Sequence, residues 1–286
     1  MTFEVWLGRH IKSFYLKRIE RLPDQRGRHA ADQSAIVFAP HQDDETLGCG
    51  GTLLLKQKAG AEIRIVFMTD GRTSHSQFMP ENELIQIREQ EALAAGSKLG
   101  IGKEMITFLR FRDGELHNFH DQAAQKVLAI LQEHQPEQVF IPYRGDNQPD
   151  HLATNQIVRS VLQSAKIQTM VYEYPVWFWF HWPWIPIWQR SRRMTKNAVV
   201  NTLRAGFGLK LMKDFQDTVT IDTVLAEKRS ALDQYKSQVT QMIPDPAWPT
   251  LSNFDGGNFL ACFFQKKEVF LHYSMLGKTE NDQTSK

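Results

Sequence analysis

The chain has 286 residues, of which 42% are hydrophobic and 23% are charged, and its formal net charge is +2. This balance argues against a nucleic-acid partner drawn by a global field, and the two cysteines, Cys49 and Cys262, exclude a disulfide framework and indicate a reducing compartment. No run of 18 apolar residues predicts a membrane span, and the N-terminus lacks the apolar core of a secretory signal. The sequence therefore predicts a cytoplasmic protein, either fully soluble or peripheral at the inner membrane surface.

From residue 34 onward, short β-rich runs alternate with longer helical patterns. The β-rich runs span 34–40, 62–70, 105–111, 138–143 and 169–175, and the helical patterns span 47–60, 82–100, 121–135 and 151–165. Apolar residues at 123, 124, 127, 128, 130 and 131 form the stripe of a helix that lies on a sheet. Repeated strand–helix–strand units predict an α/β, Rossmann-like fold, with a mostly parallel sheet and helices on both faces.

The regular alternation stops near Pro175, and we expect five segments. They are an amphipathic basic helix and linker (1–33), a Rossmann-like catalytic core (34–175), a Trp-rich and basic insertion (176–217), a C-terminal completion of the core (218–275) and a flexible tail (276–286). Beyond Pro175 we also expect helices over 197–215 and 224–238 and an edge strand over 218–221.

Polar clusters directly follow four of the predicted strands. They read HQDDE (41–45), TDGR (69–72), RDGE (112–115) and RGDNQPDH (144–151). The functional residues of such folds gather at the carboxyl ends of the strands, so the four loops should converge at one edge of the sheet. Helix capping explains one such acidic cluster but not four.

Three consecutive carboxylates, Asp43, Asp44 and Glu45, repel one another unless a positive charge lies among them. A divalent metal is the simplest such charge. His41 and Asp44 offer two ligands from one tight loop, and His151 offers a third, which leaves a position for water as in a catalytic zinc site. Asp43 can then take the proton of that water. Taken singly, these residues also fit a hydrogen-bonded loop histidine and acids that complement a helix dipole, but two His–Asp loops at one edge favour the metal.

Gly48, Gly50 and Gly51 follow the same strand and raise the alternative of a phosphate or dinucleotide loop. Their G-x-G-G spacing lacks the third glycine position, and no Lys-Ser/Thr pair follows. We therefore interpret these glycines as allowing a close approach between helix and loop beside the metal.

Several motifs together resemble one known family. PHQDDE (40–45) resembles the PHPDDE signature of the PIG-L/LmbE-like N-acetylglucosaminyl deacetylases, which are zinc-dependent and Rossmann-like. Further motifs of that family have counterparts in the same order: TDG (69–71), REQEALAAGSKLGI (88–101), DGEL (113–116), DNQPDH (146–151) and KRSALDQYKSQ (228–238). The resemblance covers residues 34–175 and 218–240.

The resemblance implies one Zn²⁺ per chain, held by His41, Asp44 and His151, with Asp43 as general base. Both assignments agree with the roles argued from the residues themselves. The favoured reaction is hydrolysis of the N-acetyl group of an N-acetylglucosamine-type amino-sugar conjugate.

Two residues depart from the family pattern. Gln42 replaces a proline, which should loosen the turn without removing a ligand. Gln148 replaces a histidine that the family uses near the developing oxyanion, and we count it as a catalytic residue of this chain. A glutamine amide donates a hydrogen bond there but cannot carry a proton, so we expect an altered rate and pH profile.

Six further side chains on or near the converging loops are candidates for binding the sugar or an attached phosphate. They are Arg72, Arg88, Arg112, Asp113, Asp146 and Asp150. Arg88 also fits an ion pair with Glu91 one helical turn away. Two other functions stay open: a sugar- or lipid-binding protein with weakened or lost catalysis, and a metal-dependent phosphoesterase.

The segment VWFWFHWPWIPIW (176–188) contains five of the seven tryptophans and is too short to span a bilayer. Its rings can pack on the sheet edge or in an oligomer interface, or they can form a sugar-stacking wall. They can also anchor the protein on an anionic membrane, because basic residues follow them directly and the N-terminal helix is basic and amphipathic. These basic residues are Arg190, Arg192, Arg193 and Lys196.

Overall fold

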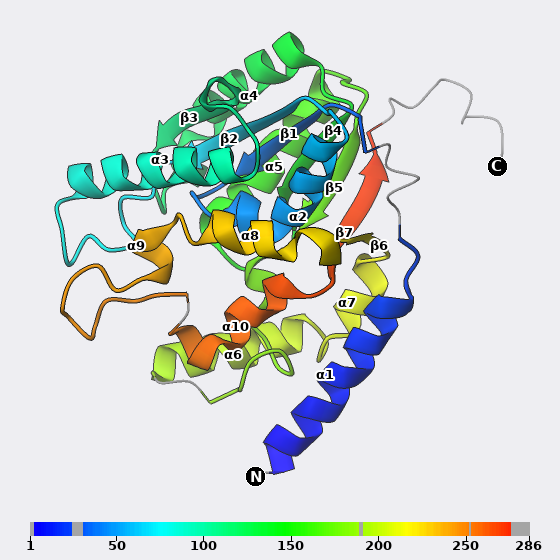
Figure 1. Cartoon of the computed structure of the whole chain (residues 1–286), viewed down its shortest axis with the longest axis vertical. Helices are drawn as coiled ribbons and strands as arrows, with labels where there is room; N and C mark the ends of the chain where they lie inside the picture. Colours follow the sequence, from blue (N-terminus) through cyan, green and yellow to red (C-terminus); the bar gives the residue numbers. More distant parts are fainter. Residues whose placement is uncertain (1–2, 25–30, 189–190, 252, 276–286) are drawn as a thin grey trace.

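The computed structural model describes residues 3–24, 31–188, 191–251 and 253–275. A seven-stranded sheet with the order β3-β2-β1-β4-β5-β7-β6 forms its centre (Figure 1). The strands are β1 (Ala35–Ala39), β2 (Ile63–Thr69), β3 (Ile106–Phe111), β4 (Gln138–Pro142), β5 (Met170–Tyr174), β6 (Asp217–Thr220) and β7 (Lys267–Ser274). Strands β1 to β5 are parallel, whereas β7 is antiparallel to both β5 and β6. The predicted mostly parallel, Rossmann-like sheet is confirmed.

Helices cover both faces of the sheet. The α-helices are α1 (Phe3–Arg21), α2 (Asp44–Lys58), α3 (Glu81–Lys98), α4 (His120–His134), α5 (Pro149–Ser164), α6 (Arg192–Arg204), α7 (Leu209–Asp214), α8 (Leu225–Leu232), α9 (Lys236–Val239) and α10 (Asn258–Ala261). Short 3-10 helices are η2 (Lys103–Met105), η3 (Leu116–Phe119), η4 (Trp177–Trp179), η5 (Asp222–Val224), η6 (Phe254–Gly257) and η7 (Cys262–Phe264). None of the helices in the described ranges is long and apolar enough to cross a membrane.

Two apolar cores lie on opposite faces of the sheet because the side chains of a strand alternate. Ala35, Val37 and Ala39 of β1 face the core that contains residues of α2, α3 and α8, whereas Ile36 and Phe38 face the core of α4 and α5. In Figure 1, α3 and α8 lie in front of the sheet. This burial on both faces fixes the strands, and therefore the loops that follow them.

Two glycines of α2 serve close packing, against Tyr174 of β5 and against Ile221 rather than against a loop beside the metal. A Cβ atom at Gly48 would lie 2.1 Å from the Tyr174 ring, and one at Gly51 would lie 2.7 Å from the Ile221 side chain. Neither distance is tolerable for a real Cβ contact, so α2 approaches β5 this closely only because it lacks side chains there.

The chain beyond β5 differs in detail from the predicted elements. The predicted helix over 197–215 is two helices, because Gly206, Phe207 and Gly208 all have positive φ angles between α6 and α7. The predicted helix over 224–238 likewise divides into α8 and α9. The edge strand is present as β6, but β7 lies between it and β5. The predicted tail (276–286), residues 25–30 of the linker and Arg190 lie outside the described residues, and the five-segment division stays a prediction.

Candidate metal centre and active site

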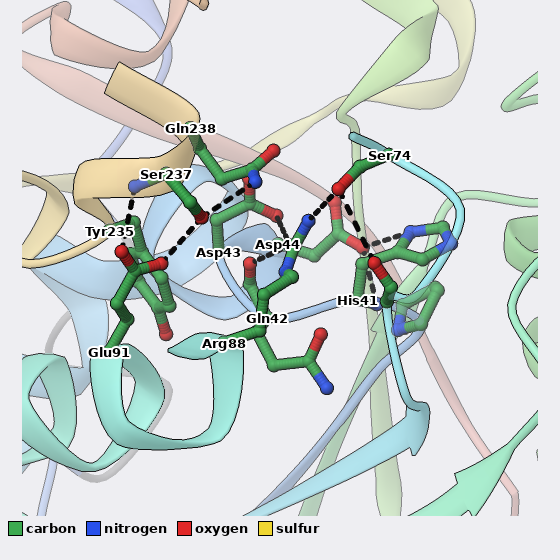
Figure 2. Close-up of polar contacts among 12 residues, drawn as sticks. His41, Gln42, Asp43, Asp44, Ser74, Arg88, Glu91, Tyr235, Ser237 and Gln238 are labelled. Atoms are coloured by element: carbon green, nitrogen blue, oxygen red, sulfur yellow. Dashed lines mark hydrogen bonds and ion pairs between the residues drawn. The ribbon is translucent and has the colours of Figure 1, made fainter. Parts of the chain in front are cut away.

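The loops after β1, β2, β3 and β4 converge at one edge of the sheet. His41 of the β1 loop lies with its Nε2 atom 3.2 Å from Asp113 Oδ1 of the β3 loop and 3.2 Å from Asp150 Oδ2 at the start of α5. Figure 2 shows the β1 loop facing Ser74, from the β2 loop, and Arg88 of α3. Residues more than one hundred positions apart in the sequence therefore meet here.

The three predicted metal ligands lie together. His41 Nδ1 and His151 Nε2 each lie 3.2 Å from Asp44 Oδ2, and one ligand atom from each residue lies within 4.8 Å of the other two. Asp44 is the first residue of α2, so the first turn of this helix orients its carboxylate. Two imidazole nitrogens and one carboxylate oxygen are a donor set that suits Zn²⁺.

Each histidine is oriented through its second ring nitrogen. His151 Nδ1 lies 3.0 Å from Asp146 Oδ2, and His41 Nε2 lies 3.2 Å from Asp150 Oδ2. A carboxylate only accepts hydrogen bonds, so the imidazole N–H donates in both contacts. Carboxylates that orient ligand histidines in this way are typical of protein metal sites.

The remaining nitrogen of His151 provides a test of whether a cation fits. His151 Nε2 is buried without a hydrogen-bond partner, although the Asp44 carboxylate lies beside it. A neutral imidazole whose Nδ1 donates to Asp146 would point the Nε2 lone pair at a negative oxygen. Burial lowers the pKa of His151, but Asp44 and Asp146 outweigh it and raise that pKa to about 9. The site therefore favours positive charge between these groups, and a divalent cation would supply it.

A second group of possible ligands, His41, Asp113 and Asp150, shares His41 with the first. The two carboxylates of this group already accept hydrogen bonds from the neighbouring loops. Asp150 accepts hydrogen bonds from the backbone N–H groups of Gly114 and Leu116, at 2.7 and 3.1 Å. Asp113 Oδ2 accepts from the Thr73 hydroxyl at 2.7 Å and from its backbone N–H at 3.0 Å. These bonds favour a role in orienting His41 over a second metal site.

Asp43 lies next to the ligand set in a strained backbone conformation. Its φ of 134° is rare for a residue with a side chain and costs on the order of 1–3 kcal/mol. Its Oδ1 atom lies 3.7 Å from Nη2 of Arg88, which also donates hydrogen bonds to the backbone carbonyl of Gln42 and to the Ser74 hydroxyl (Figure 2). Burial raises the pKa of Asp43 to about 8, with Arg88 opposing the shift. A buried carboxyl that titrates near neutrality is a candidate general base.

The two residues that depart from the family pattern lie in different settings. Gln42 is fully buried, and its Nε2 atom donates to the backbone carbonyl of Thr69 at 2.8 Å. We expected Gln42 to loosen the turn, but the structure shows that its side chain links the β1 loop to the end of β2 by a hydrogen bond. Gln148 is half-buried, occupies the position before α5, and lines the cavity of the site.

The cavity beside the ligand set has a volume of about 250 Å³. Its polar wall includes four of the predicted catalytic and substrate-binding residues, namely Asp43, Arg88, Asp113 and Gln148, and its apolar wall includes Trp177 and Phe259. The full lining is His41, Asp43, Asp44, Leu47, Thr73, Ser74, Arg88, Asp113, Gln148, Val176, Trp177, Gln238, Leu251 and Phe259.

The other candidate binding residues do not line this cavity. Arg72 pairs with Asp70 (Nη2 to Oδ2, 2.6 Å) and with Glu81, and Arg112 pairs with Glu81 and Glu115. Both arginines thus brace the loops around the site.

The two candidate carboxylates of the β4 loop are likewise enclosed. Asp146 is fully buried and accepts hydrogen bonds from His151 and from the backbone N–H groups of Val176, Trp177 and Phe178. These bonds occupy both of its oxygens. This placement, like that of Asp150, favours support of a ligand histidine over contact with substrate.

The late helical motif contributes residues for which no role was predicted from the sequence. Gln238 of α9 lines the cavity, and the adjacent Ser237 donates to Glu91 of α3 from its hydroxyl (2.6 Å) and its backbone N–H (2.7 Å). The Tyr235 hydroxyl donates to Glu45 at 2.6 Å. Glu91 is therefore bound to Ser237, and the alternative of an Arg88–Glu91 ion pair is wrong. The resemblance of residues 228–238 to a family motif was the only available signal.

The Trp-rich segment mainly packs. Trp179, Trp182 and Trp184 are buried, and Trp184 is among the largest fully buried side chains. Trp177 differs, because it lines the cavity and stacks on Phe259 with 5.2 Å between ring centroids. Packing is therefore the observed role of three tryptophans, and the sugar-wall alternative now concerns Trp177 alone.

Comparisons with known proteins agree with this geometry. Residues 36–162 match the family model "PIG-L: GlcNAc-PI de-N-acetylase". Among curated relatives, a probable N-acetyl-alpha-D-glucosaminyl L-malate deacetylase 2 of Bacillus cereus is 31% identical over 144 residues, which are 47% of this chain and 64% of the relative. The chain thus matches less than two thirds of that relative. A 1D-myo-inositol 2-acetamido-2-deoxy-alpha-D-glucopyranoside deacetylase of Rhodococcus opacus is 24% identical over 256 residues, 78% of this chain and 87% of the relative.

Among solved structures, the fold is similar to that of an N,N'-diacetylchitobiose deacetylase from Pyrococcus horikoshii. The TM-score is 0.63 at 20% sequence identity, and the match covers 99% of this chain and 97% of the other. At this identity the likeness establishes the fold alone. Residues 36–162 of this chain thus match a PIG-L domain, and the chain as a whole has a fold similar to that of this solved deacetylase.

Proposed function

We propose that this chain is a Zn²⁺-dependent hydrolase that removes the N-acetyl group from an N-acetylglucosamine-type amino-sugar conjugate. The main observation behind this proposal is that His41, Asp44 and His151 lie together beside a cavity of about 250 Å³, and that Asp43 lies next to them. The PIG-L domain supports this reaction, as do relatives whose names describe them as amino-sugar deacetylases. The buried free thiols Cys49 and Cys262 fit a reducing, cytoplasmic setting.

His41, Asp44 and His151 would hold the zinc ion, which when bound supplies Lewis-acid polarisation of the amide carbonyl and of the attacking water. The Asp43 carboxylate accepts one proton from that water as the new C–O bond forms. The protonated Asp43 then donates this proton to the amide nitrogen as the C–N bond breaks, which releases acetate and the free amine. Arg88 positions Asp43, because its guanidinium contacts the Asp43 carboxylate and donates a hydrogen bond to the backbone carbonyl of the preceding residue, Gln42.

Gln148 would stabilise charge on the carbonyl oxygen. It precedes the N-terminus of α5, where the partial positive charge of the helix favours a negative oxygen, and its amide N–H can donate to that oxygen. Because this amide does not titrate, it gives no proton and imposes no pKa of its own on the reaction.

Release of acetate is the direct test. The purified chain, stripped of metal and then reloaded with Zn²⁺, should release acetate from at least one conjugate in a panel of free, thiol-linked and lipid-linked N-acetylglucosamine. The stripped protein should not. Full zinc occupancy with no acetate from any member of the panel would favour a binding protein on this scaffold. Two metal ions per chain would favour the phosphoesterase.

We expect Gln148→His to change the pH profile. An imidazole at this position can become charged near neutral pH, so the variant should show a new ionisation in kcat/KM and a higher rate in the range where that imidazole is protonated. Steady-state rates across pH, compared with wild type, provide the measurement. An unchanged profile and rate would mean that residue 148 does not face the reacting carbonyl.

Asp150→Asn should weaken zinc binding about 10- to 100-fold, the usual effect of removing a carboxylate that orients a ligand histidine. The variant keeps the shape of the side chain but cannot accept from Gly114, Leu116 and His41 together. Competition with a chelator measures the affinity, and Asp121→Asn on the exposed side of α4 is the control. Unchanged zinc affinity with a raised KM would instead return Asp150 to the substrate-binding set.

A further inference from the structure

The exposed apolar side chains gather in one part of the molecule. Among the described residues, six of the eight large apolar side chains that stay exposed lie on α1, on α6, or at the turn into α7. They are Trp6 and Phe14 of α1, Val199 and Leu203 of α6, and Phe207 and Leu209 at the turn and start of α7. Leu203, Leu209 and Phe14 are 64, 67 and 65% exposed. We call this surface the α1–α6–α7 face.

Direct contacts join the three helices of this face. The Tyr15 hydroxyl of α1 donates to the backbone carbonyl of Phe207 at 3.0 Å, and Gly208 approaches the Tyr15 ring so closely that a Cβ would lie 2.7 Å from it. The buried Trp182 packs edge-on against Phe207 at 6.2 Å between centroids, and Gly8 of α1 lies against its indole. The buried Trp182 thus packs beneath the α1–α6–α7 face and is not part of its exposed surface. In Figure 1, the three helices lie together in the lower part of the molecule.

The same helices concentrate positive charge. Together α1, α6 and α7 contain eleven lysines and arginines against three acidic residues, although the whole chain contains 34 against 32. The rest of the chain is therefore net acidic. On α6 and α7 the basic side chains are all exposed: Arg192, Arg193, Lys196, Arg204, Lys210 and Lys213. Leu203 and Leu209 lie directly beside Arg204 and Lys210 in the sequence.

We infer that the α1–α6–α7 face docks on the surface of an anionic lipid bilayer. Exposed leucine and aromatic side chains gain free energy by entering the membrane–water interface, and the surrounding lysines and arginines are attracted to anionic headgroups. Binding of a polyanion through its phosphates alone would not explain why Leu203 and Leu209 are exposed on this face. A second copy would bring the same positive charge against itself, which is unfavourable. The combination of apolar and basic side chains favours the membrane.

Vesicle flotation tests this inference with the full chain. We expect wild type to float with vesicles of equal parts phosphatidylcholine and phosphatidylglycerol, but not with phosphatidylcholine alone. Binding should weaken in about 1 M salt, where the Debye length is about 3 Å. The test needs no deacetylase activity, so its result and that of the acetate assay are independent.

Two double variants separate the apolar and the electrostatic contributions. Leu203→Ser with Leu209→Ser, and Arg192→Glu with Lys196→Glu, should each weaken partition into the mixed vesicles by about tenfold or more. Matched controls away from the face, Met242→Ser and the pair Lys98→Glu with Lys103→Glu, should bind like wild type. Because all seven substitutions of these variants and controls are at solvent-exposed positions, circular dichroism and Tm should stay close to wild type.

Several results would overturn the inference. They are the absence of binding to the mixed vesicles, equal binding to pure phosphatidylcholine, or unchanged binding of both folded double variants. Self-association that Leu203→Ser with Leu209→Ser abolishes, without vesicle binding, would assign the face to a second copy of the chain. Binding to RNA that removes the protein from vesicles and ignores the leucine variant would assign it to a polyanion.

Discussion

Asp43→Asn should lower the rate of acetate release by about two to four orders of magnitude, the usual contribution of a general base, and should leave zinc bound. The amide keeps the size of the side chain and tolerates the positive φ of this position, since asparagine is enriched among residues with φ > 0. It cannot accept the proton of the attacking water. Rates of the zinc-loaded protein under saturating substrate, with metal content measured on the same samples, provide the check. Asp121→Asn, on an exposed carboxylate, is the matched control.

The same substitution should stabilise the metal-free protein. Burial raises the pKa of Asp43 to about 8 in the folded state, from an ordinary value of 3.8. Between these two pH values the folded state binds more protons at this group than the unfolded state does, so its contribution to stability falls as pH rises. Asparagine removes that loss. The difference in Tm between variant and wild type, in chelator, should therefore grow from pH 4 to pH 8. Near-normal turnover together with an unchanged Tm would transfer the role of base to another group.

His151→Ala should abolish stoichiometric zinc binding, and His41→Ala should do the same. Each substitution removes one of the three proposed ligands and leaves two, which is fewer than a Zn²⁺ site usually takes from the protein. The consequences for stability should differ. His151 is fully buried between Asp44 and Asp146, so its loss leaves two buried carboxylates without their positive partner. The His41 side chain is partly exposed, so water can replace it at lower cost.

Metal analysis after dialysis, together with circular dichroism and Tm, separates loss of the ligand from loss of the fold. His120→Ala, at a half-exposed histidine at the start of α4, should retain zinc and wild-type stability. If either ligand variant holds one zinc per chain, that histidine is not a ligand. In that case the group of His41, Asp113 and Asp150 becomes the alternative site to test.

Much of the fold, and the meeting of the proposed ligands at one edge of the sheet, was predictable from the sequence because it depends on local pattern. The alternation of β-rich and helical stretches predicted the parallel strands, and the rule that loops meet at the carboxyl ends of strands brought His41 and His151 together although 110 positions separate them. The apolar stripe of α4 also predicted its buried residues Ala123, Val127 and Leu131. These features need only periodicity and the handedness of the connections.

Other features depend on which partner each side chain meets. Asp146 and Asp150 have the residue types of substrate ligands, but their oxygens are occupied by backbone N–H groups from loops that the sequence does not place beside them. From the sequence, Glu91 could equally form an ion pair with Arg88 on its own helix. In the structure it instead accepts a hydrogen bond from Ser237 of α9. A carboxylate pairs with whichever donor is nearest in space, and proximity in space depends on packing rather than on pattern.

The tryptophans show the same division most clearly. The sequence alone determined that 176–188 is an aromatic segment too short to cross a bilayer and that basic residues follow it. Only the tertiary structure decided that Trp179, Trp182 and Trp184 are buried, that Trp177 lines the cavity, and that Leu203 and Leu209 are exposed. A large apolar side chain gains free energy from burial in a core and also from burial in a membrane interface, so its sequence neighbours do not decide between the two. The folded chain decides, because α1 packs against Trp182 and Trp184 and the turn between α6 and α7 packs against Trp182, whereas Leu203 and Leu209 stay exposed.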